Sequence, residues 1–162
     1  MIHFFNYNWQ VRDEWFRWCE QLEEDELDKK RTGGAGSILH TLLHISDVEY
    51  SWIRAIQGLG DTIVDFEEYR SLTEAKQLSD SFRNNIISYF AKGLIEAPDF
   101  IVSVPWDDDI FSKNEILHHI IAHEIHHIGQ LSVWARELGL APVSANFLGR
   151  DQKTASFIEP AK

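Results

Sequence analysis

The chain has very little cysteine. Cys19 is the single cysteine among 162 residues, which excludes an internal disulfide and any cysteine-based zinc cluster. It ends the aromatic run WFRWC over residues 15–19, and the sequence places no activating base beside it. We therefore interpret Cys19 as a buried structural thiol rather than a nucleophile.

Basic residues and long apolar runs are also scarce. The chain has 15 Lys and Arg against 26 Asp and Glu, a formal net charge of −11. Nucleic acids and anionic membrane surfaces are bound through clusters of positive charge, so we expect neither as a partner. We find no signal peptide and no apolar run long enough to span a bilayer, and we expect a cytoplasmic protein.

Apolar and aromatic residues, in contrast, are plentiful. Hydrophobic residues make up 44% of the chain, which has 6 Trp, 10 Phe and 4 Tyr. This content is enough for one hydrophobic core, and no repeat or domain boundary interrupts it. We predict a single domain over residues 1–162, with a loose tail over 151–162. The aromatic load also suggests an oligomer interface.

Helical periodicity predicts four helices, over residues 4–24, 38–57, 74–95 and 113–138. Ser37 is the expected N-cap of the second helix, and Ser71 or Thr73 that of the third. Ser112 and Glu115 fit a capping box at the start of the fourth. These helices predict an all-α fold, a four-helix bundle. The connections are expected to be a charged loop over 25–31, a glycine-rich linker over 32–36, a crossover over 61–72, a short strand or extended loop over 100–106, and a helical turn over 146–150.

Two histidines interrupt the apolar stripe of the last helix. His123 and His127 stand where the spacing of Ile116, Ile120 and Leu131 calls for apolar residues. They are four residues apart, so their side chains lie on one face of the helix. Two inward imidazoles with this spacing form half of a site for a transition metal such as Zn, Ni, Fe, Co or Cu. The alternative is a pair of hydrogen-bonded core histidines.

A third ligand would have to come from another helix. His44 takes an apolar position in the second helix, and His40, one turn earlier, is the rival, because residues 38–45 are mostly apolar. Three histidines would leave coordination positions open, as in catalytic sites. Other polar residues nearby could orient the ligands or shuttle protons: Asp47, Glu49, Glu124, His126 and Gln130. Each of these, taken alone, is more often an exposed helix residue.

Residues 123–127, HEIHH, also match the HExxH pattern, in which the Glu of a zinc protease is the general base. The extended pattern needs Gly and His where this chain has Gln130 and Val133. A protease would usually also bring a sheet, which the helical pattern does not predict. A zinc hydrolase is therefore the less favoured alternative.

Three stretches resemble the DinB-like (YfiT-related) family of metal-binding helical bundles: NYNW at 6–9, LLHISDVE at 42–49 and HIIAHEIHHIGQL at 119–131. The segment NFLGR at 146–150 is similar to the family's closing segment. The resemblance implies a metal triad of His44, His123 and His127, the same residues that spacing favours. It also implies an up-down-down-up bundle, with a long crossover between the second and third helices, that forms a homodimer. Ile128 departs from the Arg that many relatives carry.

The resemblance implies a divalent transition metal, Zn or Ni, as cofactor. Family members include thiol S-transferases that use bacillithiol or mycothiol, and a thiol-dependent isomerase. We therefore expect a metal-dependent enzyme for a small-molecule substrate, such as a thiol S-transferase that uses a metal-activated thiolate or water. The alternative is a non-catalytic bundle with a structural metal, which acts as an interaction module.

Overall fold

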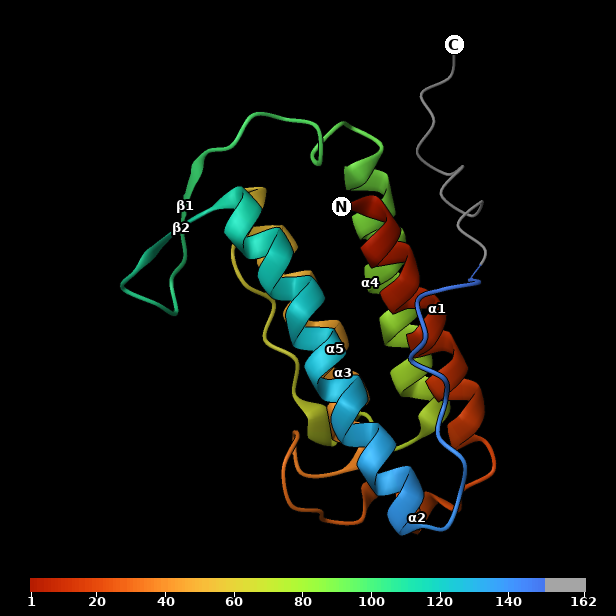
Figure 1. Ribbon diagram of the computed structural model, residues 1–162. Coiled ribbons are helices and arrows are strands. Elements are labelled where there is room, and N and C mark those ends of the chain that lie inside the picture. The colour runs from red at the N-terminus through yellow and green to blue at the C-terminus, as the bar shows by residue number, and fades with distance from the viewer. Residues whose placement is uncertain (151–162) are drawn as a thin grey trace.

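The structure, a computed structural model, describes residues 1–150, and the loose tail expected over 151–162 lies outside them. The described chain is mostly helical (Figure 1). Its long helices are α1 (Ile2–Cys19), α3 (Ile38–Ile56), α4 (Leu72–Phe90) and α5 (Lys113–Glu137), and α2 (Glu24–Asp28) and the 3-10 helix η1 (Phe66–Glu68) are short. The two strands β1 (Ile101–Ser103) and β2 (Ile110–Ser112) form an antiparallel pair. The expected all-α class is confirmed at this level.

Local caps set the starts of three helices. The Ser37 hydroxyl accepts a hydrogen bond from the His40 amide at the start of α3. Complete capping boxes begin α4, at Ser71 and Glu74, and α5, at Ser112 and Glu115. Each cap satisfies backbone N–H groups that have no partner within the helix. The predicted caps of the second and fourth helices are therefore confirmed, and Ser71 rather than Thr73 caps the third.

Several predicted boundaries were wrong. The first helix ends at Cys19 rather than residue 24, and the third ends at Phe90 rather than residue 95. Residues 25–28, expected as part of a loop, form α2 together with Glu24, because the acidic first turn suits a helix N-terminus and Leu27 is buried in the core. The turn at 146–150 is not helical: the Asn146 side chain accepts a hydrogen bond from the Leu148 amide, which competes with helix formation.

The helices pack so that α3 contacts both α4 and α5, while α1 contacts α5 and α4. In Figure 1, residues 57–71 leave the upper end of α3 and return along the molecule to the lower end of α4, so α3 and α4 point the same way. The β1–β2 hairpin extends sideways from the start of α5.

The core is divided into two apolar clusters. One gathers around Trp15, Leu42 and Leu131, and the other around Phe5, Ile53 and Ile120. Buried polar side chains lie on all four long helices, and on α3, α4 and α5 they occupy sequence positions between the two clusters. We call this set the polar layer; it consists of Asn8, Arg12, Ser46, Glu49, Ser79 and Glu124.

Candidate metal centre

Three histidines converge between α3 and α5, beside the polar layer. His44 comes from α3, and His123 and His127 come from successive turns of α5. Their ligand nitrogens all lie within 4.8 Å of one another. His127 is buried, whereas His44 and His123 are half-buried. The predicted set of residues is thus brought together where two of its three side chains are partly exposed; its role as a metal ligand set stays a prediction.

The nitrogen separations suit a shared ion. The Nε2 atom of His123 lies 3.1 Å from Nε2 of His44 and 3.1 Å from Nε2 of His127. Nitrogens about 2.0–2.1 Å from a tetrahedral zinc ion lie about 3.3–3.4 Å from one another. Two of the three separations are therefore close to those around a shared ion, and the third, between His44 and His127, is at most 4.8 Å.

Hydrogen bonds among the rings do not explain this arrangement well. Nδ1 of His127 lies 2.7 Å from Oε1 of Gln130, and an amide oxygen can only accept, so Nδ1 carries the ring proton. Nε2 of His127 then has a lone pair and no proton. His123 Nε2 would have to share a single proton between His127 and His44, whereas a cation satisfies all three lone pairs.

Burial keeps the triad neutral. It lowers the pKa of His44, and the neighbouring His127 adds to the effect. The pKa of His127 is also lowered, mainly by burial. For His123, burial and then the surrounding histidines lower the pKa to about 3. All three imidazoles are therefore neutral at neutral pH. In this form each ring has one nitrogen with a free lone pair, which can bind a metal.

Gln130 connects the triad to its surroundings. Its carbonyl oxygen holds the His127 ring, and its Nε2 lies 3.0 Å from Nε2 of the exposed His126. Such a partner fixes the tautomer and orientation of a metal-binding histidine. The glycine-rich segment packs close by: a Cβ at Gly34 would lie 3.1 Å from Gln130 Oε1 and 2.6 Å from the Trp134 ring.

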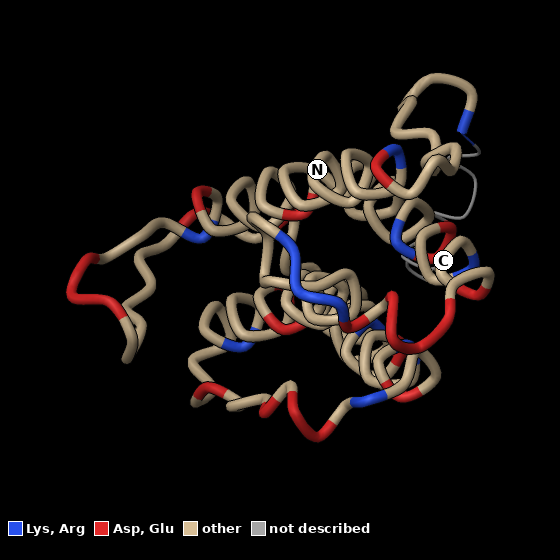
Figure 2. The backbone as a smooth tube through the Cα atoms, turned by 90° about the horizontal axis from the view of Figure 1, so that it is seen from below, with Lys and Arg blue, Asp and Glu red and all other residues tan. Residues whose placement is uncertain are grey.

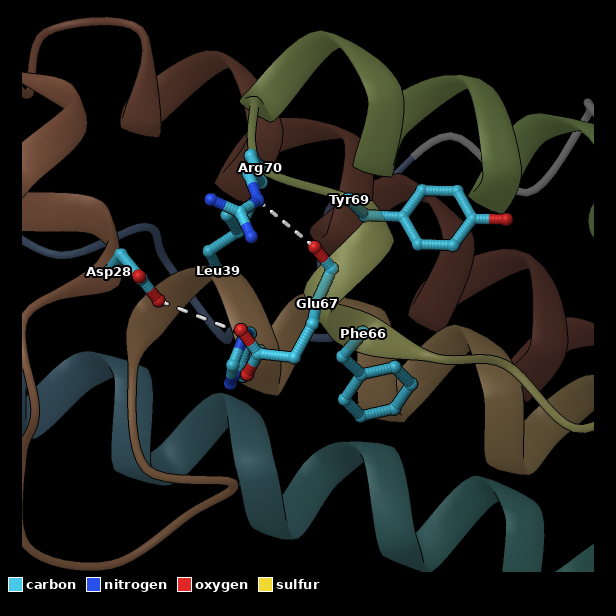
Figure 3. Close-up of a pocket in the computed structure, with 7 residues that line it drawn as sticks. Asp28, Leu39, Phe66, Glu67, Tyr69 and Arg70 are labelled. Atoms are coloured by element: carbon cyan, nitrogen blue, oxygen red, sulfur yellow. Dashed lines mark hydrogen bonds and ion pairs between the residues drawn. The ribbon is translucent and has the colours of Figure 1, made fainter.

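His40, the rival ligand, belongs to a different place. Its Nε2 lies 3.7 Å from an Asp28 carboxylate oxygen, and its ring packs against Phe66. It lines a pocket of about 110 Å³ where η1 covers the start of α3, together with Asp28, Leu39, Phe66, Glu67, Tyr69 and Arg70 (Figure 3). The structure therefore separates His40 from the triad, a choice that periodicity left open.

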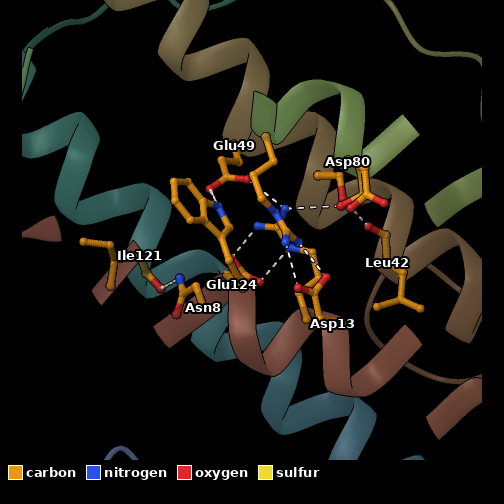
Figure 4. Close-up of polar contacts among 12 residues, drawn as sticks. Asn8, Asp13, Leu42, Glu49, Asp80, Ile121 and Glu124 are labelled. Carbon is orange, nitrogen blue, oxygen red and sulfur yellow. Dashed lines mark hydrogen bonds and ion pairs between the residues drawn. The ribbon is translucent and has the colours of Figure 1, made fainter. Parts of the chain in front are cut away.

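Glu49 and Glu124 face Arg12 in the polar layer (Figure 4). The Arg12 guanidinium donates to both oxygens of Glu124, at 2.8 and 2.6 Å, and to Oε2 of Glu49 at 2.8 Å. The indole of Trp9 donates to the other Glu49 oxygen at 2.7 Å. Burial alone would lower the pKa of Arg12, but Glu124 and Glu49 outweigh it and raise that pKa. Both carboxylates are therefore engaged with a charged arginine.

Arg12, the cation of the polar layer, was not among the residues predicted from the sequence. Arg12 lies between Val11 and Trp15, which are buried, and is itself only 1% exposed. The sequence pattern that could have indicated Arg12 is a single cation on the apolar face of a predicted helix.

Asp47, one turn after His44 on α3, is half-buried, and burial followed by the nearby Asp61 carboxylate raises its pKa to about 6.

Two comparisons place the chain among known proteins. A sequence model of the DinB family matches residues 1–160. The uncharacterized protein YizA of Bacillus subtilis (strain 168) is 59% identical over 154 residues, which cover 94% of this chain and 97% of YizA. No helix within residues 1–150 has the length and apolar character needed to cross a membrane. On the family match and this identity, the chain belongs to the DinB family.

Proposed function

We propose that this protein binds a divalent transition metal, Zn or Ni, through His44, His123 and His127 and acts as a metal-dependent thiol S-transferase. One observation carries the proposal: three neutral imidazoles from two helices converge within 4.8 Å. Three nitrogen ligands leave coordination positions open, as in catalytic zinc sites, whereas structural sites are usually closed by four protein ligands.

The ion and the residues around it would have different roles in this proposal. A bound divalent ion supplies Lewis acidity, which lowers the pKa of a thiol or water that it coordinates. Gln130 keeps the proton of His127 on Nδ1, so that Nε2 faces the site. The half-buried His44 and His123 leave one side open to a substrate.

The nucleophile in this proposal comes from a small-molecule thiol rather than from the chain. Cys19 is 0% exposed, and burial raises its pKa to about 12. In the transfer, the thiol releases its proton to solvent and its sulfur forms a bond to a carbon of an electrophile. The bond between that carbon and the leaving group breaks, and the leaving group departs with the electron pair.

A zinc hydrolase of the HExxH type has less support. Its general base would be Glu124, but that side chain is 1% exposed and both of its oxygens accept hydrogen bonds from Arg12. Freeing the carboxylate would remove one of the two carboxylate partners of the buried Arg12, which is costly.

Three further features belong to the same proposal. The four long helices form an up-down-down-up four-helix bundle, in which residues 57–71 are the crossover between α3 and α4. Two copies form a homodimer. The protein acts in the cytoplasm, where low-molecular-weight thiols are kept reduced.

The test is metal analysis of protein purified without chelator or affinity metal, followed by a screen of low-molecular-weight thiols against alkylating electrophiles. We expect about one Zn or Ni ion per chain and transfer that chelation abolishes. Metal at this ratio without turnover of any thiol would favour the alternative of an interaction module with a structural metal. Absence of metal after attempted reconstitution would overturn both.

A further inference from the structure

A pocket of about 300 Å³ lies beside the triad, where the hairpin meets α3 and the first turns of α5. Its lining residues are Trp52, Asp107, Phe111, Glu115, Ile116 and His119. A cavity of about 150 Å³ is enough for benzene, so this pocket has room for a ring with substituents.

The pocket lies next to the triad along α3 and α5. Trp52 lies eight residues after His44 on α3, and His119 lies four before His123 on α5, so each shares a helix face with its triad residue. The His119 ring centroid lies 5.7 Å from that of His123 and 5.6 Å from that of Trp52. One imidazole therefore separates the pocket from the triad.

The pocket offers flat apolar surfaces. The rings of Trp52 and Phe111 meet at an interplanar angle of 88° with centroids 5.6 Å apart, and Trp106 packs against the same indole. Aromatic walls at such angles accommodate another ring by stacking or edge contacts. Ile116, which is buried, adds an aliphatic surface.

The charged groups of the pocket are acidic. Asp107 belongs to the acidic loop between β1 and β2, which is red at the far end of the hairpin in Figure 2. Its carboxylate accepts a hydrogen bond from the Asp109 amide, and that of Glu115 accepts one from the Ser112 amide. Neither is neutralised by a cation in the described ion pairs. An anionic ligand would be repelled, whereas a neutral or cationic one would not.

We propose that this pocket binds the electrophilic substrate of the reaction, and that it selects a flat aromatic or unsaturated group that carries no negative charge. This inference rests on the proposed function for the identity of the reaction. The binding specificity itself follows from the aromatic walls and the two carboxylates. The alternative is that the aromatic residues only anchor the hairpin on α3.

The experiment compares three probes of one shape: benzyl alcohol, benzylamine and benzoate, which are neutral, cationic and anionic at pH 7. Binding is followed by the indole N–H resonance of Trp52 in two-dimensional NMR, assigned with Trp52→Phe. We expect saturable shifts with benzyl alcohol and benzylamine, with dissociation constants of about 1–10 mM. Benzoate should bind at least about tenfold more weakly.

Variants separate binding from support of the fold. Phe111→Ala should weaken benzyl alcohol about tenfold, whereas Tyr69→Ala, in the pocket beside His40, should leave it unchanged. Asp107→Asn combined with Glu115→Gln keeps the side-chain shapes and the capping box, and it should raise the affinity for benzoate to that for benzyl alcohol. An anchor for the hairpin would not respond to charge in this way.

Two results would overturn the inference: no saturable shift of the Trp52 resonance with any probe, or benzoate binding as tightly as benzyl alcohol in the unmodified protein. Metal content is measured on the same samples. Probe binding by protein that cannot be loaded with metal would defeat the proposed function and leave the pocket in place. Metal binding without probe binding would overturn the inference about the pocket and leave the proposed function in place.

Discussion

At the scale of single residues, neighbouring histidines on α5 have different environments. His127 is buried in the triad with its Nδ1 on Gln130, whereas His126 is exposed. His123 and His127 share one helix face, and His126 lies about 100° away from His127 around the helix. The pair His126 and His127 therefore allows a comparison between a proposed ligand and an exposed neighbour that contacts Gln130 and the His127 ring but lies outside the triad.

We expect His127→Ala to lose metal binding and activity while it remains folded. The loss of stability should be at most a few kcal/mol, from a small cavity and the lost linkage to the ion. His126→Ala, the control, should keep its metal and its melting temperature. The measurements are metal content, circular dichroism and thermal unfolding, with chelated wild type alongside. A His127→Ala protein that does not fold would instead indicate that the metal is structural.

Cys19 gives a second prediction at this scale. Because it is 0% exposed and burial raises its pKa to about 12, the native thiol should react with iodoacetamide at pH 8 far more slowly than a free cysteine. Unfolding in guanidinium chloride should restore ordinary reactivity. Mass spectrometry of the alkylated protein measures both rates. Rapid labelling of the native protein would mean that the thiol is accessible and that a chain nucleophile must be reconsidered.

At the scale of elements, the segment before α3 reaches the candidate metal centre. Gly34 has φ +55, and an added Cβ would lie 2.6 Å from the Trp134 ring and 2.9 Å from Thr41 Oγ1, beside the Gln130 amide. Gly33 has φ +86 but nothing within 4 Å of such a Cβ. Both glycines therefore have a positive φ that favours glycine, and only at Gly34 would an added side chain also collide with neighbouring atoms.

Gly34→Ala should consequently weaken metal binding, because the methyl group pushes on Gln130 and so on the orientation of His127. We expect both Gly34→Ala and Gly33→Ala to lose about 1 kcal/mol of stability from the positive φ, with an added loss for Gly34→Ala alone. Metal affinity, measured by competition with a chelating dye, should fall for Gly34→Ala and stay at the wild-type value for Gly33→Ala. Equal affinities would mean that the segment does not influence the centre.

At the scale of the whole molecule, the ion pairs of the polar layer join three helices. Arg12 from α1 reaches Glu49 on α3 and Glu124 on α5, and all three are almost completely buried. A second arginine, Arg83, forms an ion pair with Asp13 that is partly exposed to solvent. Arg12 has two buried carboxylate partners and Arg83 has one that is partly exposed, so the two arginines compare buried with partly exposed ion pairing.

Arg12→Met should destabilise the protein by about 3–5 kcal/mol, because it leaves two carboxylates buried without a cation. Arg83→Met should cost about 0–1 kcal/mol. Without Arg12, burial raises the pKa of Glu124 above its unfolded value, so the folded variant holds protons that the unfolded chain releases. Its stability should therefore fall as the pH rises from 5 to 8, which urea unfolding across this range would measure. A loss independent of pH would contradict this account.

The proposed homodimer is tested by the mass of the protein in solution. Light scattering at micromolar concentration should give twice the chain mass of 18.8 kDa. The exposed apolar residues available for such contacts include Ile125 and Val133 on α5. A mass of one chain under these conditions would contradict the dimer without affecting the metal centre, because all three proposed ligands come from one chain.

Features that depend on neighbours along the chain could be predicted from the sequence. Helix starts at Ser37 and Ser112 follow from local hydrogen bonds between a hydroxyl and nearby amides. The shared face of His123 and His127 follows from helix geometry alone. Short elements were less predictable: α2 depends on the burial of Leu27, and β1 depends on its pairing with β2.

Only the tertiary structure decided which polar residues face one another. The choice between His40 and His44 rested on the rotation of α3 against α5 and on Asp28 and Phe66, which hold His40 elsewhere. Glu124 stands in a metal-binding pattern by sequence, yet Arg12, 112 positions away, holds it in the core. Such contacts join residues far apart in the chain, and a buried charge is stable only where a partner from another helix meets it. Local periodicity holds no information about that partner.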